Sequence, residues 1–572
     1  MKKVVYVPLD DRPVNLDDVI VQGKSAGIEV ITPNAGDIRN RLDTQKTVSG
    51  SEVTSTSDPV YGKPGDIARF IEERADEADG FIISIDMLAY GGLIGSRYLR
   101  PEDSQAYPDF DCSTTDLLDT IRRVKQMCPH KPVYVMDTIM RLATTVHVEG
   151  LTTPAYQESR NFMRQPRKHF ESFEEILEGY DLKPDGTAYG DTVHFNKTHF
   201  YNTRRHKLKT TRYVLERLTQ EGYIDFLAIG VDDAYIEGVQ ANEIAWVEER
   251  IDSGLGGVNG KNPDRAVILP DADGLGHSLL ARMAGRIYHG PAKPRYRVRY
   301  YGPHGSTVIN PYEYMDVNEN IRSHVDIAGG QLVASGPFEM DIIAVTDDNQ
   351  AAQAVEHVEA NGGCGVPSIV LDFTSGGVAN EKVTTALLAS PFTGRLLGYS
   401  AWNTAGNKIG LAVGMGHARY AFLTGNVPLQ TLNAALNAHG TLLFKRFLKD
   451  YAYKALTIGE IRAEAAQRSP YTNVTADANM LLFVSASDYS DLSALLEERM
   501  QTHTAILAAA NAFIPAASPA ACNIHRIHSG AWDLVPYTSV TLPPANTGFT
   551  WGRAFEITLN PSAELGLNSE SL

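Results

Sequence analysis

Short apolar runs alternate with amphipathic stretches along the first half of the chain. The apolar runs are typical of buried strands and lie at 4–7, 28–31, 81–85, 133–136, 226–231, 266–269 and 296–301. Most are separated by stretches with helical spacing, at 66–79, 115–127, 207–220, 242–251 and 276–287. This alternation predicts a parallel sheet covered by helices. We expect an α/β fold with a distorted (β/α) TIM-like barrel, and an open doubly wound sheet is the alternative.

A second pattern of the same kind begins after residue 305. Strand-like runs at 341–346, 368–372 and 396–400 alternate there with helical stretches at 351–360 and 382–389. From about residue 428 the periodicity is mainly helical, and a strand-like run at 555–559 precedes a polar tail. The sequence therefore predicts a barrel-like catalytic domain at 1–305, a smaller α/β domain at 306–427 and a mainly helical C-terminal region at 428–572.

Acidic residues follow the predicted strands at one recurring position. Five of the first six strands are followed directly by such residues, namely Asp10, Asp11, Asp86, Asp137, Asp232, Asp233, Asp271 and Asp273. Parallel strands present their carboxyl ends at one edge, so these side chains are expected to converge on one pocket. Arg12, Arg97 and Arg141 follow the same strands, and carboxylates combined with guanidinium groups suit a ligand rich in hydroxyl groups. The pattern indicates a sugar.

Asp232 and Asp233 differ from the other candidates because two carboxylates are adjacent at the end of one apolar run. Neighbouring carboxylates repel each other, so the pKa of one rises and the pair supplies an acid and a base at neutral pH. We expect this pair to be catalytic. The alternative is a turn or a helix N-cap, positions that Asp also favours.

Other side chains at strand ends are candidates for substrate binding: Tyr90, Tyr235, His277, Trp402, Asn403 and Asn407. A tryptophan stacks on the apolar face of a pyranose ring, and asparagines bond its hydroxyl groups. For the last three residues the alternative is a buried tryptophan at a domain interface with asparagines in turns.

Four segments together resemble the bacterial domain-of-unknown-function family 4127, and this resemblance covers most of the chain. The segments are Pro8–Pro13, Asp86–Gly92, Asp232–Tyr235 and Trp402–Asn407. The family brings no activity that can be transferred to this chain.

The segment Gly230–Tyr235 resembles the catalytic corner of substrate-assisted N-acetylhexosaminidases. The resemblance implies that Asp232 bonds the acetamido N–H of the sugar, and that Asp233 protonates the departing glycosidic oxygen. Tyr235 would bond the acetamido oxygen, which attacks the anomeric carbon. Repulsion from an ionised Asp232 raises the pKa of Asp233, as this division of roles requires.

The amino-acid composition limits the classes of molecule that this protein is expected to bind. The 572 residues include 52 Lys and Arg against 69 Asp and Glu, and the resulting net charge of -17 disfavours nucleic acid and anionic membranes. The four cysteines are dispersed, and no apolar stretch approaches the length of a membrane span. We expect a cytoplasmic protein with a small carbohydrate substrate and no cofactor, nucleic-acid partner or membrane partner. The oligomeric state stays open, with a homo-oligomer as one option.

These observations predict a retaining exo-glycoside hydrolase that removes a terminal N-acetylhexosamine, as a β-N-acetylgalactosaminidase or a β-N-acetylglucosaminidase. One alternative is a metal-dependent hydrolase, in which a divalent ion is bound by Asp10, Asp11, Asp271, Asp273 and His277. Another is a non-catalytic sugar-binding protein with the same acidic rim. Sequence motifs of P-loop nucleotidases, serine esterases and zincins are absent.

Overall fold

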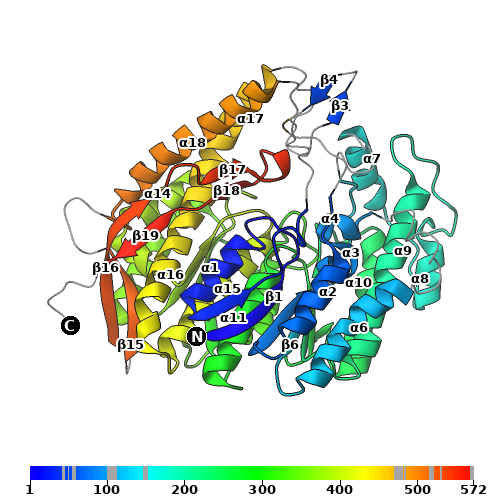
Figure 1. Cartoon of the computed structure of the whole chain (residues 1–572), viewed down its shortest axis with the longest axis horizontal. Coiled ribbons are helices and arrows are strands. Elements are labelled where there is room, and N and C mark those ends of the chain that lie inside the picture. The colour runs from blue at the N-terminus through cyan, green and yellow to red at the C-terminus, as the bar shows by residue number, and fades with distance from the viewer. Residues whose placement is uncertain are drawn as a thin grey trace.

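The computed structural model describes residues 1–40, 46–48, 51–53, 60–98, 112–145, 153–468, 481, 485–514, 521–528 and 531–566. Two parallel sheets with helices packed on both faces form the body of the molecule (Figure 1). β3 (Lys46–Val48) and β4 (Ser51–Val53) pair as a short antiparallel hairpin. The α/β class expected from the sequence is confirmed.

The first sheet has seven strands within the described residues: β1 (Lys2–Val7), β2 (Ile28–Ile31), β5 (Gly80–Ser84), β6 (Val133–Ile139), β7 (Phe226–Val231), β8 (Lys261–Asn262) and β9 (Ala266–Leu269). Their order is β2-β1-β5-β6-β7-β9-β8, and only β8 pairs antiparallel. The order reverses between β1 and β5. In doubly wound sheets ligands bind beyond the carboxyl ends of the strands at this reversal.

A barrel is not confirmed. β2 and β8 are the end strands of the hydrogen-bonded order, and no pairing between described residues joins them. The run 296–301, which the sequence pattern assigned to the barrel, is strand β10 (Arg295–Tyr301) and pairs with strands of the second sheet. A local hydrophobic pattern identifies a strand but does not reveal which sheet it joins, because long-range contacts decide that.

The second sheet consists of β10 and four further described strands: β11 (Gln331–Leu332), β12 (Met340–Val345), β13 (Ser368–Asp372) and β14 (Gly398–Ser400). All pairs are parallel, and the order is β11-β10-β12-β13-β14. The strand order of this sheet also reverses beside its first strand in the sequence, β10, so both sheets have a doubly wound topology.

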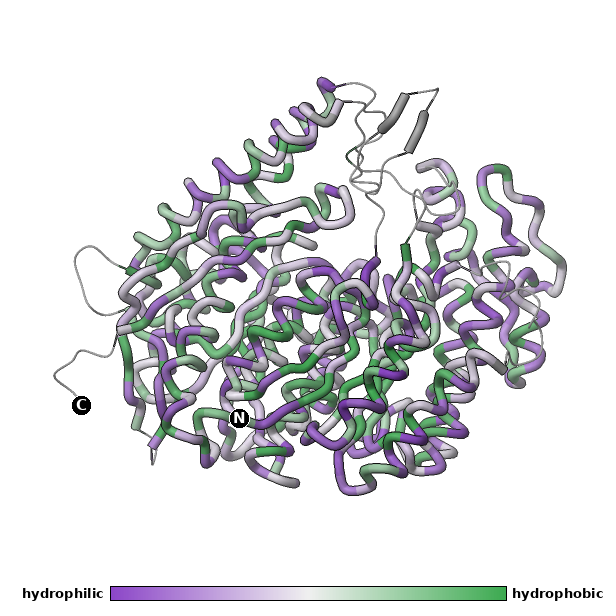
Figure 2. Tube along the Cα trace, viewed as in Figure 1, coloured by the Kyte–Doolittle hydropathy of each residue, from purple (hydrophilic) through white to green (hydrophobic). Residues whose placement is uncertain are grey.

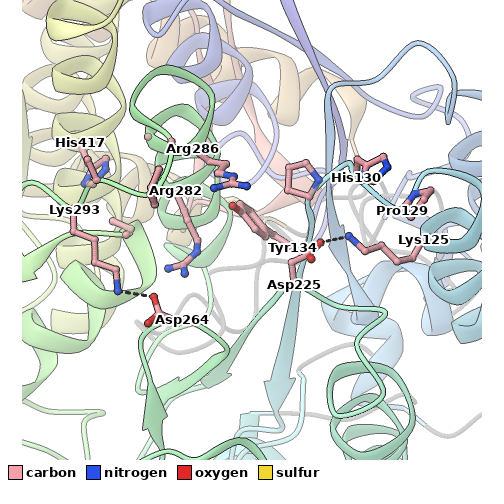
Figure 3. Close-up of a pocket in the computed structure, with 17 residues that line it drawn as sticks. Lys125, Pro129, His130, Tyr134, Asp225, Asp264, Arg282, Arg286, Lys293 and His417 are labelled. Carbon is pink, nitrogen blue, oxygen red and sulfur yellow. Dashed lines mark hydrogen bonds and ion pairs between the residues drawn. The ribbon is translucent and has the colours of Figure 1, made fainter.

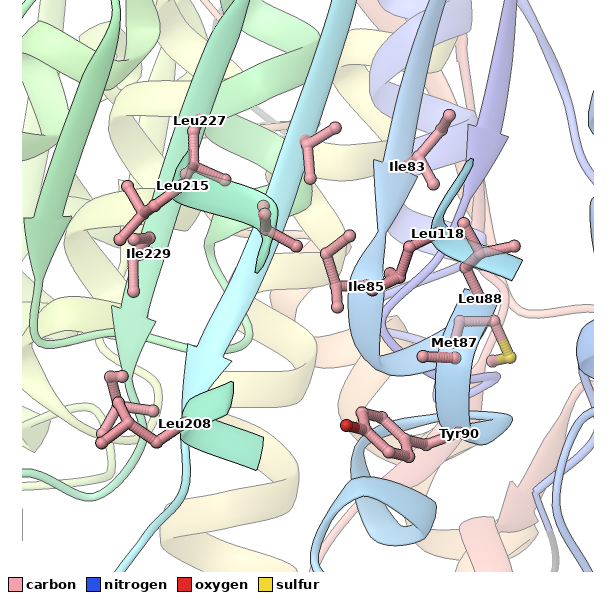
Figure 4. Packing of buried hydrophobic residues seen from close by; sticks show 14 of the residues in the cluster. Ile83, Ile85, Met87, Leu88, Tyr90, Leu118, Leu208, Leu215, Leu227 and Ile229 are labelled. Atoms are coloured by element: carbon pink, nitrogen blue, oxygen red, sulfur yellow. The ribbon is translucent and has the colours of Figure 1, made fainter. Parts of the chain in front are cut away.

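Alternate residues of the central strands enter different hydrophobic cores. Val5 and Val7 pack in the outer core, whereas Val4 and Tyr6 pack in the core between the two sheets. The outer core is covered by α2 (Pro64–Glu73), α6 (Cys112–Met127), α9 (Lys197–Tyr213), the π-helical turn η1 (Val214–Thr219) and α10 (Val239–Leu255). Figure 4 shows this packing, with Leu227 of β7 close to Leu215. In Figure 2 hydrophobic segments run through the interior of the molecule.

The core between the sheets is built mainly by α1 (Asp17–Ser25), α11 (Leu275–His289), α12 (Val317–Ala328) and α15 (Ala405–Thr424). The far face of the second sheet is covered by α13 (Ala351–Cys364), α14 (Glu381–Ala389) and α16 (Leu432–Phe447). Because the two sheets share a core, the loops at the end of β14 are brought to the rim of the first sheet.

The C-terminal region continues with the π-helix η5 (Leu448–Thr457), α17 (Ile458–Ala466) and α18 (Ala486–Ala508). Strands follow that the sequence pattern did not predict: β15 (Cys522–His528), β16 (Ala531–Thr541), β17 (Thr547–Phe549) and β19 (Ser562–Leu565). The expected run at 555–559 corresponds to β18 (Ile557–Leu559), which pairs with β17. In Figure 1 this hairpin lies close above the central strands, so the end of the chain reaches the site described below.

Buried ion pairs join α1, near the N-terminus, to α16. Asp18 on α1 accepts Lys445 Nζ at 2.5 Å and Arg446 Nη2 at 2.8 Å from α16, and all three side chains are buried. Removing one partner of such a group leaves an uncompensated buried charge, which is strongly destabilising. No helix in the described part of the chain combines the length and apolar character needed to cross a bilayer.

Candidate functional site

A cavity of about 320 Å³ opens at the carboxyl ends of the first sheet. Its charged lining residues are Arg12, Arg97, Arg141, Asp232, Asp233, Asp273 and Arg553. The other lining residues are Leu93, Ile94, Tyr156, Tyr312, Asn403, Thr404, Asn407, Trp551 and Phe555. Eight of the residues predicted from strand ends are therefore in one cavity. They follow β1, β6, β7, β9 and α4 (Leu93–Ser96), or lie in the loop after β14 and the first turn of the next helix.

Asp232 and Asp233 enter the cavity because β7 is a fully buried strand that ends at its rim. Asp232 is buried and forms an ion pair with Arg97, which follows α4. Asp233 has a φ of 42°, a left-handed conformation that Asp tolerates better than most residues. Its carboxylate is 3.6 Å from Arg141 Nη1, and its side chain is 30% exposed. Both aspartates therefore line this cavity.

Burial and the neighbouring charge of Asp232 raise the pKa of Asp233 to about 6, against the opposing effect of Arg141 and Arg97. The ordinary value of an aspartate is near 4. The carboxyl group of Asp233 therefore keeps its proton up to about pH 6, well above the range of an ordinary aspartate. This is the property that a general acid requires.

Arg12 ties two strand ends together. Its Nε donates to Asp10 Oδ2 at 2.9 Å, and its Nη1 donates to Asp273 Oδ2 at 3.2 Å. Asn15 Nδ2 donates to the same two carboxylates, at 2.9 Å to Asp10 and 3.1 Å to Asp273. The loops after β1 and β9 are thereby held in register, with Asp273 and Arg12 on the cavity wall and Asp10 behind them.

The second sheet contributes the opposite wall through the start of α15. Thr404 is the N-cap, and its side chain accepts from Asn407 N. Asn407 Oδ1 in turn accepts the backbone N–H of Asp273 at 3.2 Å, which fixes the β9 loop against α15. Asn403 has a φ of 64° and lines the cavity.

The chain's C-terminal region supplies a wall that the sequence analysis missed. Trp551, Arg553 and Phe555 line the cavity from the segment between β17 and β18. Trp551 Nε1 donates to Asp11 Oδ1 at 2.9 Å, so Asp11 positions the indole without lining the cavity itself. Burial and Asp10 raise the pKa of Asp11 to about 7. The one sequence signal was the aromatic and basic cluster Trp551–Phe555 next to a strand-like run.

Backbone strain concentrates at this cavity. Of the six non-glycine residues with positive φ in the described part of the chain, four line it: Asp233, Tyr312, Asn403 and Trp551. Such conformations cost of order 1–3 kcal/mol each and persist where the surrounding structure imposes them, commonly at functional sites. The strain distinguishes this cavity independently of its charges.

Three predicted substrate contacts lie outside the cavity lining. Asp86 and Asp137 are fully buried and share Lys207 Nζ, which is 3.1 Å from Asp86 Oδ1. Tyr90 is buried, and its hydroxyl is 3.1 Å from His206 Nδ1 and 2.5 Å from Thr210 Oγ1. These side chains hold α9 against the first sheet. The sequence pattern placed these residues correctly after the strands of the sheet. It could not show that Lys207 of α9 forms ion pairs with Asp86 and Asp137.

His277, Trp402 and Tyr235 are also outside the lining, which corrects their expected roles. His277 has Nδ1 2.5 Å from Gln22 Oε1 and Nε2 2.8 Å from the carbonyl of Val14, and burial lowers its pKa to about 4. Trp402 is fully buried, so the alternative of a packed interior tryptophan holds and the indole is not available to stack on a sugar. Tyr235 accepts hydrogen bonds from Arg160 and lies beneath the guanidinium of Arg164.

The residues expected for a metal-dependent hydrolase are not gathered into a metal site. Within the described residues no group of three or more His, Cys, Asp and Glu has the arrangement to hold a metal ion. Asp10 is occupied by Arg12, and both His277 nitrogens are hydrogen bonded. Asp271 accepts the backbone N–H of Ala272 and Gly274, and burial raises its pKa to about 8. Protonated and backbone-bonded carboxyl groups are poor metal ligands.

A second cavity, of about 410 Å³, lies at the amino ends of the same strands (Figure 3). Its charged groups are mostly paired with one another. Lys125 Nζ is 2.7 Å from Asp225, and Lys293 Nζ is 2.5 Å from Asp264. Arg282 donates to the backbone carbonyl of Asp326 at the end of α12. This cavity is larger, but most of its ions are engaged in local structure and Arg286 is exposed, so we regard the carboxyl-end cavity as the candidate site.

Comparison with known proteins adds one finding. A family model described as "Protein of unknown function (DUF4127)" matches residues 4–560, which is most of the chain. No curated protein matches it in sequence. The family resemblance expected from the four motifs is confirmed, and the site itself has to carry any functional argument.

Proposed function

The chain belongs to the DUF4127 family of proteins of unknown function, and we propose that it is a retaining exo-glycoside hydrolase that removes a terminal N-acetylhexosamine by substrate assistance. The observation that carries the proposal is the arrangement of Asp232 and Asp233. The two carboxyl groups face one cavity, and their environments differ in the direction that this mechanism requires.

Asp232 is suited to orient the acetamido group. Arg97 contacts its Oδ2 and compensates its charge, whereas no described residue donates a hydrogen bond to its Oδ1. An ionised carboxylate with one available oxygen accepts the acetamido N–H of a substrate through a charge-assisted hydrogen bond. This bond places negative charge beside the acetamido group and makes its oxygen a better nucleophile.

Asp233 is suited to act first as acid and then as base. In the first step the acetamido oxygen attacks the anomeric carbon, the bond to the glycosidic oxygen breaks, and Asp233 gives its proton to that oxygen. In the second step Asp233 takes a proton from water, which attacks the anomeric carbon and opens the cyclic intermediate. Two displacements at one carbon retain its configuration.

The remaining lining residues complete a sugar site. Asn403 supplies an amide at the cavity wall, and Trp551, which is largely buried but lines the cavity, is the indole proposed for the role expected of Trp402. An indole offers an apolar face to a pyranose ring. Tyr312 lines the cavity, and its ring lies 5.6 Å from that of Tyr235. Its hydroxyl is therefore proposed for the bond to the acetamido oxygen that was expected from Tyr235.

The test uses 4-nitrophenyl β-N-acetylglucosaminide and β-N-acetylgalactosaminide with the purified protein. The proposal predicts release of nitrophenol from at least one of them, with the β-anomer as the first product by NMR and no loss of rate in the presence of a chelator. A series of N-acyl substrates with increasing fluorination should react progressively more slowly, because the acyl oxygen becomes less nucleophilic. Release without this dependence would exclude substrate assistance.

Substrates with different leaving groups distinguish the proposed roles of Asp232 and Asp233. Asp233→Asn should lose far more activity on alkyl glycosides than on dinitrophenyl glycosides, since a good leaving group needs no proton. Asp232→Asn should lose activity on both. Asp264→Asn, in the amino-end cavity, is the matched control and should behave as wild type. Sugar binding without turnover on any substrate would favour the non-catalytic alternative.

Finer predictions accompany this proposal. A closed barrel, a cytoplasmic location and a carbohydrate as the main partner, with no nucleic acid, stay predictions.

A further inference from the structure

The candidate cavity has more cationic than anionic groups. Its described lining includes four arginines, Arg12, Arg97, Arg141 and Arg553, against three aspartates, Asp232, Asp233 and Asp273. A neutral sugar does not require this excess, so the pairing of each arginine decides whether it belongs to the scaffold or to a ligand.

Two of the arginines are matched by carboxylates. Arg12 lies between Asp10 and Asp273, and Arg97 pairs with Asp232. Glu556, which is 3.8 Å from Arg12, is itself held by Lys449 Nζ at 2.6 Å. These carboxylates are therefore used within the protein.

Arg553 is not matched. No described residue accepts a hydrogen bond from its side chain or forms an ion pair with it, and its Nε is buried without a partner. The guanidinium lies 4.9 Å from the ring centre of Trp551 and 5.8 Å from that of Phe555, two other lining residues. Burial and the charge of Arg12 lower the pKa of Arg553 to about 9, and the more distant charges of Glu556 and Asp10 only partly oppose this shift.

Arg141 is matched only while Asp233 is ionised. Its Nε and Nη2 donate to the carbonyls of Ala143 and Thr144, and its Nη1 is 3.6 Å from Asp233. The proposed mechanism begins with Asp233 protonated. In that state Arg141 and Arg553 both line the cavity, and neither forms an ion pair with an ionised carboxylate among the described residues.

We propose that the cavity contains a subsite for an oxyanion, formed by Arg553 and Arg141, and that the substrate is an N-acetylhexosamine bearing or adjoining a sulfate, phosphate or carboxylate group. This inference rests on the proposed function and names its substrate class. Guanidinium groups bind such oxyanions through paired, charge-assisted hydrogen bonds. The negative charge of the ligand replaces the counter-ion that Asp233 ceases to supply.

The experiment compares N-acetylhexosamine, its 6-sulfate, its 6-phosphate and a disaccharide with N-acetylhexosamine linked to a uronate, by calorimetry with the full chain. We expect at least one anionic sugar to bind about 10- to 100-fold more tightly than the neutral sugar, the range that one or two charge-assisted hydrogen bonds supply. The sugar with this advantage identifies the source of the oxyanion.

Variants locate the effect. Arg553→Met should abolish the preference for the anionic sugar, and Arg553→Lys should keep part of it, because the charge remains and the paired geometry is lost. Arg299→Met removes an exposed arginine of β10 outside the cavity and should change nothing. Thermal unfolding checks that each variant is folded. Equal binding of neutral and anionic sugars, or a preference that survives in Arg553→Met, would overturn the inference.

The outcomes separate the two proposals. Turnover of neutral aryl glycosides without any preference for an anion leaves the glycosidase and removes the subsite. Binding of an anionic sugar through Arg553 without turnover on any aryl glycoside leaves the subsite and removes the glycosidase.

Discussion

The cavities at the two ends of the first sheet contain similar types of residue but match their charges differently. At the amino ends, Lys125 and Lys293 each pair with one aspartate, and the partners are partly exposed. At the carboxyl ends, the side chains of Arg97 and Asp232 are only 9% and 8% exposed, Asp233 is 3.6 Å from Arg141 Nη1, and Arg553 forms no ion pair with a described residue. A polar cavity is therefore not evidence of a site unless some of its groups remain unsatisfied.

The backbone draws the same distinction. Strained left-handed residues occur at the lining of the carboxyl-end cavity, and none of the described lining residues of the amino-end cavity other than glycine has positive φ. Unmatched charge and strain both destabilise a fold. Among the described lining residues of the two cavities, strain at residues other than glycine occurs at the carboxyl end only, which is where doubly wound folds bind ligands.

The largest expected difference between the two ends concerns catalysis. Asp233→Asn should lower kcat/KM for an alkyl N-acetylhexosaminide by about 10²- to 10⁴-fold, the usual contribution of a general acid. Asp264→Asn should leave it unchanged. Steady-state kinetics of both variants checks this. Equal losses in the two would mean that the carboxyl-end cavity is not the reactive one.

Stability should differ next. Arg97→Met leaves Asp232 buried without its counter-ion and should lower the free energy of unfolding by about 3–5 kcal/mol. Lys293→Met breaks a more exposed pair and should cost less than about 1 kcal/mol. Urea unfolding measures both. Similar values for the two variants would contradict the view that only the carboxyl-end pair is desolvated.

The pH dependence is the third comparison. The proton on Asp233 is needed for activity, and the pKa is raised to about 6, so kcat/KM should fall as the pH rises through this value. A raised pKa also means that the folded state is stabilised by the neutral form. That stabilisation is complete below the unfolded value near 4 and is lost as the pH rises through about 6.

Asp233→Asn should therefore unfold at a higher temperature than wild type above pH 6, although it is inactive, and the difference should shrink at pH 4. Melting curves at the two pH values test this. A variant that is less stable than wild type at pH 8 would show that the carboxylate is a net stabilising partner of Arg141.

The smallest effect concerns the strained backbone. Asn403→Gly relieves a left-handed conformation and should change the free energy of unfolding by only a few tenths of a kcal/mol, whereas Asn403→Ala should cost about 1 kcal/mol. Both variants should raise KM for the sugar, since they remove the amide from the cavity wall. An unchanged KM in both would remove Asn403 from the binding site.

Much of this site was readable from the sequence because it depends on strand ends. Asp232, Asp233 and Asp273 follow buried apolar runs, and parallel strands bring such residues to one edge. The same rule could not separate them from Asp86 and Asp137, because Lys207 reaches those carboxylates from a helix distant in sequence. The sequence around Asp86 and Asp137 does not reveal that a lysine on a distant helix compensates their charges.

The fold shows the same limit. The longer strands of both sheets were predicted within a few residues, whereas the two-residue strands β8 and β11 were not, and the membership of β10 and the order of the strands depend on long-range pairing. Trp551, Arg553 and Phe555 were missed for this reason too. Their local sequence resembles any turn between strands, and only tertiary packing brings them opposite Arg12 and Arg97.

The wall formed by Trp551, Arg553 and Phe555 also bears on the order in which the cavity can assemble during synthesis. The strands of the first sheet and its acidic rim precede residue 274, whereas the indole that Asp11 contacts belongs to a residue much later in the sequence. A chain truncated before this wall would keep the aspartates but lack one side of their enclosure. On the proposed function, such a chain should bind the ligand more weakly than the full chain does.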